Sequence, residues 1–148
     1  MALGFLDGWY VGGTSDDLAE FLRRHGADGY QVHEIRHSAC QACRGDVFGV
    51  EGSLEDPTVA RRTCRRCGHR QYIADSGEYW DEKQVYVSVC ACEEEDFVVA
   101  VGFSLYRDSG MAGVRSLAMA ERCLACGKIA SLAEWMARTG DMTLLDRA

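Results

Sequence analysis

Residues 40–68 read CQACRGDVFGVEGSLEDPTVARRTCRRCG, and residues 90–127 read CACEEEDFVVAVGFSLYRDSGMAGVRSLAMAERCLACG. Each stretch opens with two cysteines one or two residues apart and closes on Cys-x-x-Cys-Gly. A tight loop of this kind places two sulfurs on the same side of the chain, and two facing loops present four sulfurs as a tetrahedron. The sequence therefore predicts two sites that each bind a metal ion through four cysteines.

Pairing the cysteine loops in chain order uses all eight cysteines of the chain. The linkers hold twenty residues between Cys43 and Cys64 and thirty between Cys92 and Cys123, enough for a β-hairpin that returns to the first loop. A cross-braced pairing, in which each site takes alternate loops, is the alternative. We expect one structural zinc ion in each site. The first site comprises Cys40, Cys43, Cys64 and Cys67, and the second comprises Cys90, Cys92, Cys123 and Cys126.

The two stretches also repeat one another over about 50 residues, which favours pairing in chain order. After its first cysteine pair, each has an aspartate, a phenylalanine and valines, then a Ser-Leu pair, then an arginine shortly before the last cysteine pair. A tryptophan follows in each copy, Trp80 in the first and Trp135 in the second. We expect two copies of one module, with the tryptophans filling thin cores at the cysteine loops or at the joint between modules.

These cysteine loops resemble those of the zinc ribbon family over residues 34–136. The resemblance rests on Cys40-x-x-Cys43 with Cys64-x-x-Cys67-Gly68, and on Cys90-x-Cys92 with Cys123-x-x-Cys126-Gly127. It implies zinc knuckles on three-stranded antiparallel sheets, in which the metal replaces a large core. The short Cys90-x-Cys92 spacing and the long second linker depart from the family pattern. Members serve in transcription, in ribosomes and in protein interaction, so the resemblance selects no function.

The remaining sequence predicts a mostly β fold with a short N-terminal helix and two tandem zinc-ribbon modules. Thr14 or Ser15 caps a helix over 16–25, whose apolar stripe packs on one of the modules. Strand patterns lie at 30–35, 47–50, 72–73, 85–89, 97–105 and 114–119, and a helical pattern returns at 131–136. We expect an N-terminal segment at 1–33, a first ribbon at 34–84, and a second ribbon with a C-terminal helical tail at 85–148.

Composition and charge narrow the classes of function. The chain has 148 residues and a net charge of −7, and two tetrathiolate zinc sites would add about four negative charges, so repulsion from nucleic acid is the default. No run of about 18 apolar residues predicts a membrane span. Residues 1–7 lack the basic and long apolar regions of a secretory signal. We expect a cytoplasmic protein with no membrane contact.

Other uses of paired cysteines fit this sequence less well. Disulfides need an oxidising compartment, and a redox Cys-x-x-Cys is usually a single motif at the start of a helix. Iron, as in rubredoxins, is chemically allowed by four thiolates. A catalytic zinc keeps an open position, which two complete sets of four ligands do not provide. A zinc-dependent or thiol-based enzyme ranks below the two binding functions described next.

A basic cluster surrounds the second cysteine pair of the first module and suggests where a partner binds. Its arginines are Arg61, Arg62, Arg65, Arg66 and Arg70. Such a cluster can grip phosphates or an acidic protein surface, but it can also balance anionic thiolates and pair with nearby acids. We expect a non-enzymatic module that binds a protein partner or acts as a scaffold. The alternative is a transcription-related zinc ribbon protein that binds nucleic acid through the arginines of the segment 61–70.

Overall fold

The computed structural model describes residues 3–107, 113–138 and 140–148, and these form mostly β-strands with one α-helix. The strands are β1 (Gly4–Leu6), β2 (Trp9–Val11), β3 (Glu34–His37), β4 (Phe48–Ser53), β5 (Ala60–Cys64), β6 (Arg70–Tyr72), β7 (Val85–Val87), β8 (Phe97–Leu105), β9 (Val114–Cys123) and β10 (Lys128–Met136). The helix is α1 (Ser15–His25), and short 3-10 helices lie at Ser76–Tyr79, Glu82–Gln84 and Met142–Arg147. The prediction of a mostly β fold with a short N-terminal helix is confirmed.

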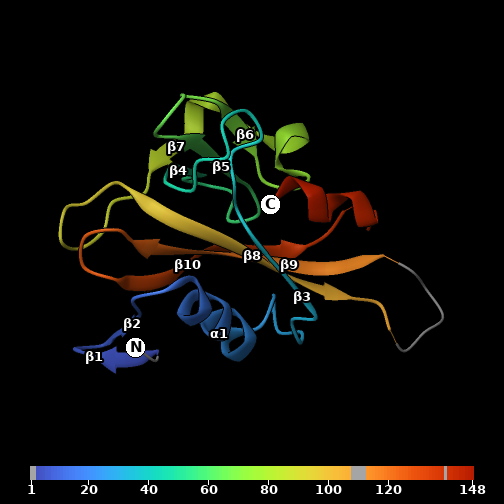
Figure 1. The fold of residues 1–148 in the computed structure, drawn as a ribbon. Helices are drawn as coiled ribbons and strands as arrows, with labels where there is room; N and C mark the ends of the chain where they lie inside the picture. Colours follow the sequence, from blue (N-terminus) through green and yellow to red (C-terminus); the bar gives the residue numbers. More distant parts are fainter. Residues whose placement is uncertain (1–2, 108–112, 139) are drawn as a thin grey trace.

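The elements stack in three layers (Figure 1). The long antiparallel strands β8, β9 and β10 form the middle layer, and β2 and β3 pair with its two outer strands. Helix α1 covers one face of this layer, and a smaller sheet in the order β7-β4-β5-β6 covers the other. A single residue pair, Phe48 opposite Phe97, joins β4 to β8 and links the two sheets.

The hairpins that carry the cysteine loops have the same register in the first half of the chain (residues 34–84) and the second half (85–148). Phe48 lies opposite Cys64 in the β4–β5 pair, and Phe97 lies opposite Cys123 in the β8–β9 pair. The third strand also matches, because the residue just before each of these cysteines pairs with Arg70 in β6 and with Ile129 in β10. Each half therefore presents its two cysteine loops at the same end of a three-stranded antiparallel sheet.

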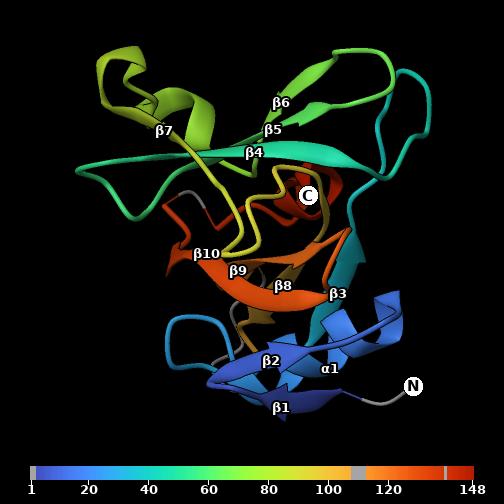
Figure 2. The ribbon, with the colours of Figure 1, turned by 90° about the vertical axis from the view of Figure 1, so that its left-hand side faces the viewer.

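The two halves exchange edge strands. Strand β3 precedes the first cysteine loop but pairs with β8, and β7 precedes the second pair of loops but pairs with β4 (Figure 2). His37, three residues before the first cysteine of its half, lies opposite Ala100. Val87 occupies the same position in the second half and lies opposite Glu51. Each half thus completes the sheet of the other, so neither sheet is built from one continuous segment.

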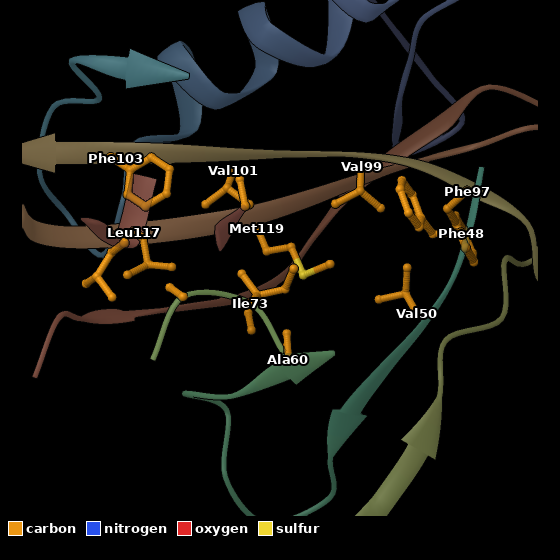
Figure 3. Close-up of a cluster of buried hydrophobic side chains, with 14 of the residues drawn as sticks. Phe48, Val50, Ala60, Ile73, Phe97, Val99, Val101, Phe103, Leu117 and Met119 are labelled. Carbon is orange, nitrogen blue, oxygen red and sulfur yellow. The ribbon is translucent and has the colours of Figure 1, made fainter. Parts of the chain in front are cut away.

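The largest hydrophobic core lies between the two sheets. Side chains of the small sheet and of the segment after β6 point toward those of β8 and β9 (Figure 3). The buried residues labelled there are Phe48, Val50, Ala60, Ile73, Phe97, Val99, Val101, Phe103, Leu117 and Met119. Leu144 and Leu145 of the last 3-10 helix join the same core. Because both halves contribute, this core does not divide into one core per cysteine site.

Helix α1 forms as its sequence indicates. Thr14 is the N-cap, and its hydroxyl accepts a hydrogen bond from the Asp17 amide, while the Asp17 carboxylate accepts one from the Thr14 amide. Gly26 follows the helix at a φ of 81°, a conformation that favours glycine. The apolar stripe Leu18, Phe21 and Leu22 is buried against β8 and β9. The helix therefore packs, as predicted, on the strands of the cysteine hairpin, here that of the second half.

Leu22→Ala is expected to lower the free energy of unfolding by about 2–5 kcal/mol, because a fully buried leucine leaves both its transfer energy and a cavity behind. Urea titration of the metal-loaded chain measures this change. Arg23→Ala, at the neighbouring exposed position of the same helix, is the control and should stay within about 0.5 kcal/mol of the parent chain. Equal effects of the two substitutions would contradict the packing of α1.

One sequence prediction of secondary structure is wrong, and it concerns the segment that forms β10. The segment 131–136, predicted as helical, lies in strand β10, where Ala133 and Trp135 are buried in turn. Pairing with β9 outweighs the local helical preference of alanine, leucine and glutamate there. The helical tail lies further on, at Met142–Arg147. The hairpin β1–β2 and strand β5 were not predicted at all.

Within the described ranges, no helix is long and apolar enough to cross a membrane.

Candidate metal centres

The first cysteine cluster has the geometry of a tetrahedral metal site. Its four Sγ atoms all lie within 4.8 Å of one another. The Cys40 and Cys67 sulfurs are 3.5 Å apart, and so are those of Cys43 and Cys64. Four sulfurs at 2.3 Å from a central ion would be separated by about 3.8 Å along each edge. Small shifts of the side chains therefore place all four sulfurs around one ion.

The second cluster repeats this arrangement despite its shorter first loop. Its sulfurs also lie within 4.8 Å of one another, with 3.5 Å between Cys90 and Cys126 and between Cys92 and Cys123. The two clusters are the groups that pairing in chain order predicts. Each could hold one metal ion, and a set of four thiolates suits zinc or iron.

Backbone hydrogen bonds shape the last cysteine loop of each half in the same way. The Gly68 amide donates to the Cys64 carbonyl at 2.9 Å, and the Gly127 amide donates to the Cys123 carbonyl at 3.0 Å. Both glycines have a positive φ, of 78° and 79°. A residue with a Cβ is strained in that conformation, which explains the glycine after each second cysteine pair.

The cysteines of the first cluster differ in how easily they ionise when no metal is bound. Burial opposes ionisation of Cys40, but hydrogen bonds from the Cys43 and Ala42 amides lower its pKa to about 6. At Cys67, a backbone hydrogen bond from His69 favours the thiolate. Hydrogen bonds shared with the other three sulfurs of the cluster, together with burial, outweigh it and raise the pKa of Cys67 to about 12. One thiolate is thus ready for an incoming cation, and the metal must displace the remaining protons.

The second cluster shows the same contrast between its two first-loop cysteines. A backbone hydrogen bond from Glu94 lowers the pKa of Cys92 to about 7. Burial, together with hydrogen bonds shared with neighbouring sulfurs, raises the pKa of Cys90 to about 12. Both clusters therefore contain a thiol that is ionised near neutral pH beside one that only a metal ion would deprotonate there.

Gly45→Ala is expected to weaken metal binding at the first site by about tenfold to a hundredfold. A Cβ at this position would lie 3.2 Å from the Cys64 sulfur and 3.3 Å from the Cys43 sulfur, closer than ordinary packing allows. Such crowding costs about 1–3 kcal/mol when neighbours cannot move freely. Competition with a chromophoric chelator measures the affinity of each ion. The second site serves as internal control, and equal release of both ions from parent and variant would contradict the expectation.

The structure divides the predicted arginine cluster into buried and exposed members. Arg61 is only 2% exposed; its guanidinium donates to Glu51 and Glu82 and lies 4.4 Å from the centre of the Trp80 ring. Burial disfavours its charge, but the two carboxylates raise its pKa above the ordinary value. Arg62 is 1% exposed and donates to the backbone oxygen of Ala148 at 2.8 and 3.1 Å. These two arginines hold the fold together and face no solvent.

The other three predicted arginines lie at the surface, and one of them links the halves. Arg65 forms an ion pair with Asp96 at 2.7 Å and donates to the Glu95 carbonyl. The basic last loop of the first half therefore touches the acidic first loop of the second, within one chain. Arg66 and Arg70 are exposed.

A buried joint between the halves was only partly anticipated from the sequence. The Trp135 indole donates to Asp75 at 2.9 Å, and Arg138 donates to the same carboxylate through its backbone amide and its guanidinium. The expectation that Trp135 packs at a joint fits this contact. Nothing local marks Asp75 as its partner, because the two residues lie sixty positions apart.

The buried carboxyl group of Glu121 was also not identified from the sequence. Glu121 is 7% exposed and accepts a hydrogen bond from the Ser88 hydroxyl at 2.6 Å. Burial raises the pKa of Glu121 to about 7, although the Ser88 hydrogen bond works in the opposite direction. It stands two residues before Cys123, the position that Arg62 occupies before Cys64. The matching positions thus carry a buried base in the first half and a buried acid in the second.

No protein-family model matches the chain, and neither a curated protein nor a solved structure matches it. Fold and site geometry are therefore the basis for a functional proposal.

Proposed function

We propose that this chain is a non-enzymatic zinc protein whose two structural ions hold together a surface for a protein partner. The observation that carries the proposal is the completeness of both sites. Each cluster supplies four sulfurs from the protein. Four thiolates complete the tetrahedral coordination of a zinc ion and leave no coordination position for substrate or water. The sites also lie where hairpins meet loops, as structural sites do, rather than in a cleft of convergent polar groups.

Zinc is the ion that we propose, at two per chain, and a reducing compartment such as the cytoplasm is the setting. All eight cysteines are free thiols in the structure, and thiolate sites stay intact where disulfides do not form. Zinc binds four thiolates without redox chemistry.

The same proposal treats the two halves as copies of one zinc-ribbon module, divided near residue 84. The equal registers of the β4–β5 and β8–β9 hairpins and the equal positions of the glycines after the last cysteines support it. Because β3 pairs with β8 and β7 pairs with β4, we propose that the two modules are interlocked and not separate units. The N-terminal segment, through α1, completes the second module.

A protein partner is favoured over nucleic acid by the placement of the arginines. Arg61 and Arg62 are buried inside the fold, and Arg65 forms an ion pair with Asp96. Only Arg66 and Arg70 then remain as exposed cations of the cluster with no ion pair described, on a chain whose net charge is −7. Nucleic-acid binding through so small a patch would be weak and strongly dependent on salt.

Two measurements test the proposal. Native mass spectrometry with elemental analysis should find two zinc ions per chain, and one ion or iron would overturn the metal assignment. Titration with mixed DNA and RNA at low salt should find no binding. Binding that falls steeply with salt, and falls again in Arg66→Ala together with Arg70→Ala, would establish the nucleic-acid alternative instead.

A further inference from the structure

The two matching sheets differ at their outer edges. In the second half, β2 lies along the outer edge of β10: Tyr10 pairs with Ile129, and the Gly12 amide donates to the Gly127 carbonyl at 3.0 Å. In the first half the matching positions are Arg70 and Gly68. No strand among the residues that the structure describes pairs there, and β6 ends the order of strands. We call residues 68–72 the free edge of β6; Figure 2 shows it at the margin of the small sheet.

The backbone of the free edge is oriented to accept a strand. The Cys64 amide donates to the His69 carbonyl, and the Ile73 amide donates to the Ala60 carbonyl, so residues 69, 71 and 73 face β5. In an antiparallel pair the alternate residues face the other way. The N–H and C=O groups of Arg70 therefore point outward, as those of Ile129 do toward β2. An unpaired edge of this kind is a template for an added strand.

A groove follows the free edge and selects the chemistry of the added strand. Its cavity has a volume of ≈ 340 Å³ and is lined by β6, by the turn at Asp75 to Glu78 and by Arg147. Tyr72 and Gly77 contribute apolar lining, and the exposed residues Arg70 and Arg147 contribute two cations. Asp75 adds no open negative charge, because Arg138 and Trp135 already bind it. Glu78 is the one exposed carboxylate of the wall.

We propose that the free edge of β6 binds an extended acidic segment of the partner protein as an antiparallel strand. The partner residue opposite Arg70 makes both backbone hydrogen bonds, as Tyr10 does with Ile129. Its side chain, and the side chains two positions away along the added strand, lie on the same face as Arg70 and place carboxylates beside the groove that Arg70 and Arg147 line. Main-chain bonds supply affinity in this mode of recognition, and the groove supplies selectivity. The inference rests on the proposed function and names the site and the class of its partner.

The test uses the whole zinc-loaded chain and a phage-displayed library of random twelve-residue peptides. The enriched peptides should be acidic, and a synthetic copy should slow hydrogen exchange of the Arg70 amide by at least tenfold. Arg70→Glu should weaken that peptide by at least tenfold, because it reverses the charge at the centre of the site. Arg36→Glu is the matched control, since Arg36 is an exposed arginine on another edge strand, β3.

The remaining outcomes overturn the proposal. An absence of enriched peptides, protection of amides outside residues 68–72, or equal binding by Arg70→Glu and the parent chain would each do so. Displacement of the peptide by single-stranded RNA that itself binds more tightly would assign the edge to nucleic acid. A native protein partner that binds Arg70→Glu as well as the parent would leave the proposed function standing and place its surface elsewhere. Failure of both tests, for peptide and for partner, would remove the interaction function itself.

Discussion

Cys64→Ser is expected to reduce the bound metal from two ions to one and to destabilise the whole chain, including the half that keeps its ion. A structural zinc site contributes on the order of 10 kcal/mol to folding, as much as the total stability of a typical domain. From the sequence alone, with two modules in tandem, one would expect only residues 34–84 to unfold. The exchanged strands change that expectation.

The coupling has two physical sources. Unfolding of the first half removes the partner of β7 in the small sheet and uncovers the face of β8 and β9 that carries Val99, Phe103 and Met119. Exposure of apolar area costs roughly 25 cal/mol per Å², and these side chains are fully buried. The second half would then keep only the cover that α1 gives to its other face.

Hydrogen exchange followed by mass spectrometry tests the coupling, with native mass spectrometry as the count of bound ions. Amides of β8 and β9 in Cys64→Ser should exchange much faster than in the parent chain. Thr63→Ser, one position earlier in β5, should keep two ions and parent-like exchange. Parent-like protection of β8 and β9 in Cys64→Ser, together with free exchange over residues 34–84, would show two independent modules.

Asp75→Ala is expected to lower the free energy of unfolding by about 3 kcal/mol. The substitution strips the Trp135 indole of its acceptor inside the core and leaves the Arg138 guanidinium without its carboxylate. An unsatisfied buried donor costs about 1–3 kcal/mol, and breaking a buried ion pair costs about 3–5 kcal/mol. Arg138 is 24% exposed, so water offsets part of its loss and the total stays at the lower end.

A double-mutant cycle with Trp135→Phe isolates the contact that joins the halves. The indole and the carboxylate are in direct contact, so a coupling free energy of about 0.5–3 kcal/mol is expected from denaturant titrations of the metal-loaded variants. Glu55→Ala removes an exposed carboxylate of the same half and should change stability by less than about 0.5 kcal/mol. Additive effects of Asp75→Ala and Trp135→Phe would mean that the joint does not stabilise the fold.

The cysteine spacing and the repeat were enough to predict the two groups of four cysteines that the structure brings together, because each cysteine loop is local and the repeat favours pairing in chain order. Helix α1 was also predictable, since its cap, stripe and terminal glycine lie within thirteen consecutive residues, Thr14 to Gly26. The segment 131–136 was not, because its side chains suit a helix until β9 offers a strand partner.

The burial of charged side chains was the feature that the sequence predicted least well. The sequence shows five arginines near the first cysteine site, and nothing in it distinguishes Arg61 from Arg66. Strand β5 buries Arg61 against Glu51 on the neighbouring strand and against Glu82 twenty-one positions away, while Arg66 falls on a loop in solvent. The difference is one of cross-strand neighbours, which appear only when the sheet forms.

Local spacing by itself thus determined two clusters of four cysteines, a capped helix and a mostly β chain. The tertiary structure alone decided that the halves exchange β3 and β7, that two arginines become interior, and that the edge of β10 is covered while that of β6 stays open. The physical reason is common to all three. Cysteine loops and helix caps are satisfied by atoms a few residues away, whereas a strand edge or a buried charge is satisfied by whatever distant segment packs against it.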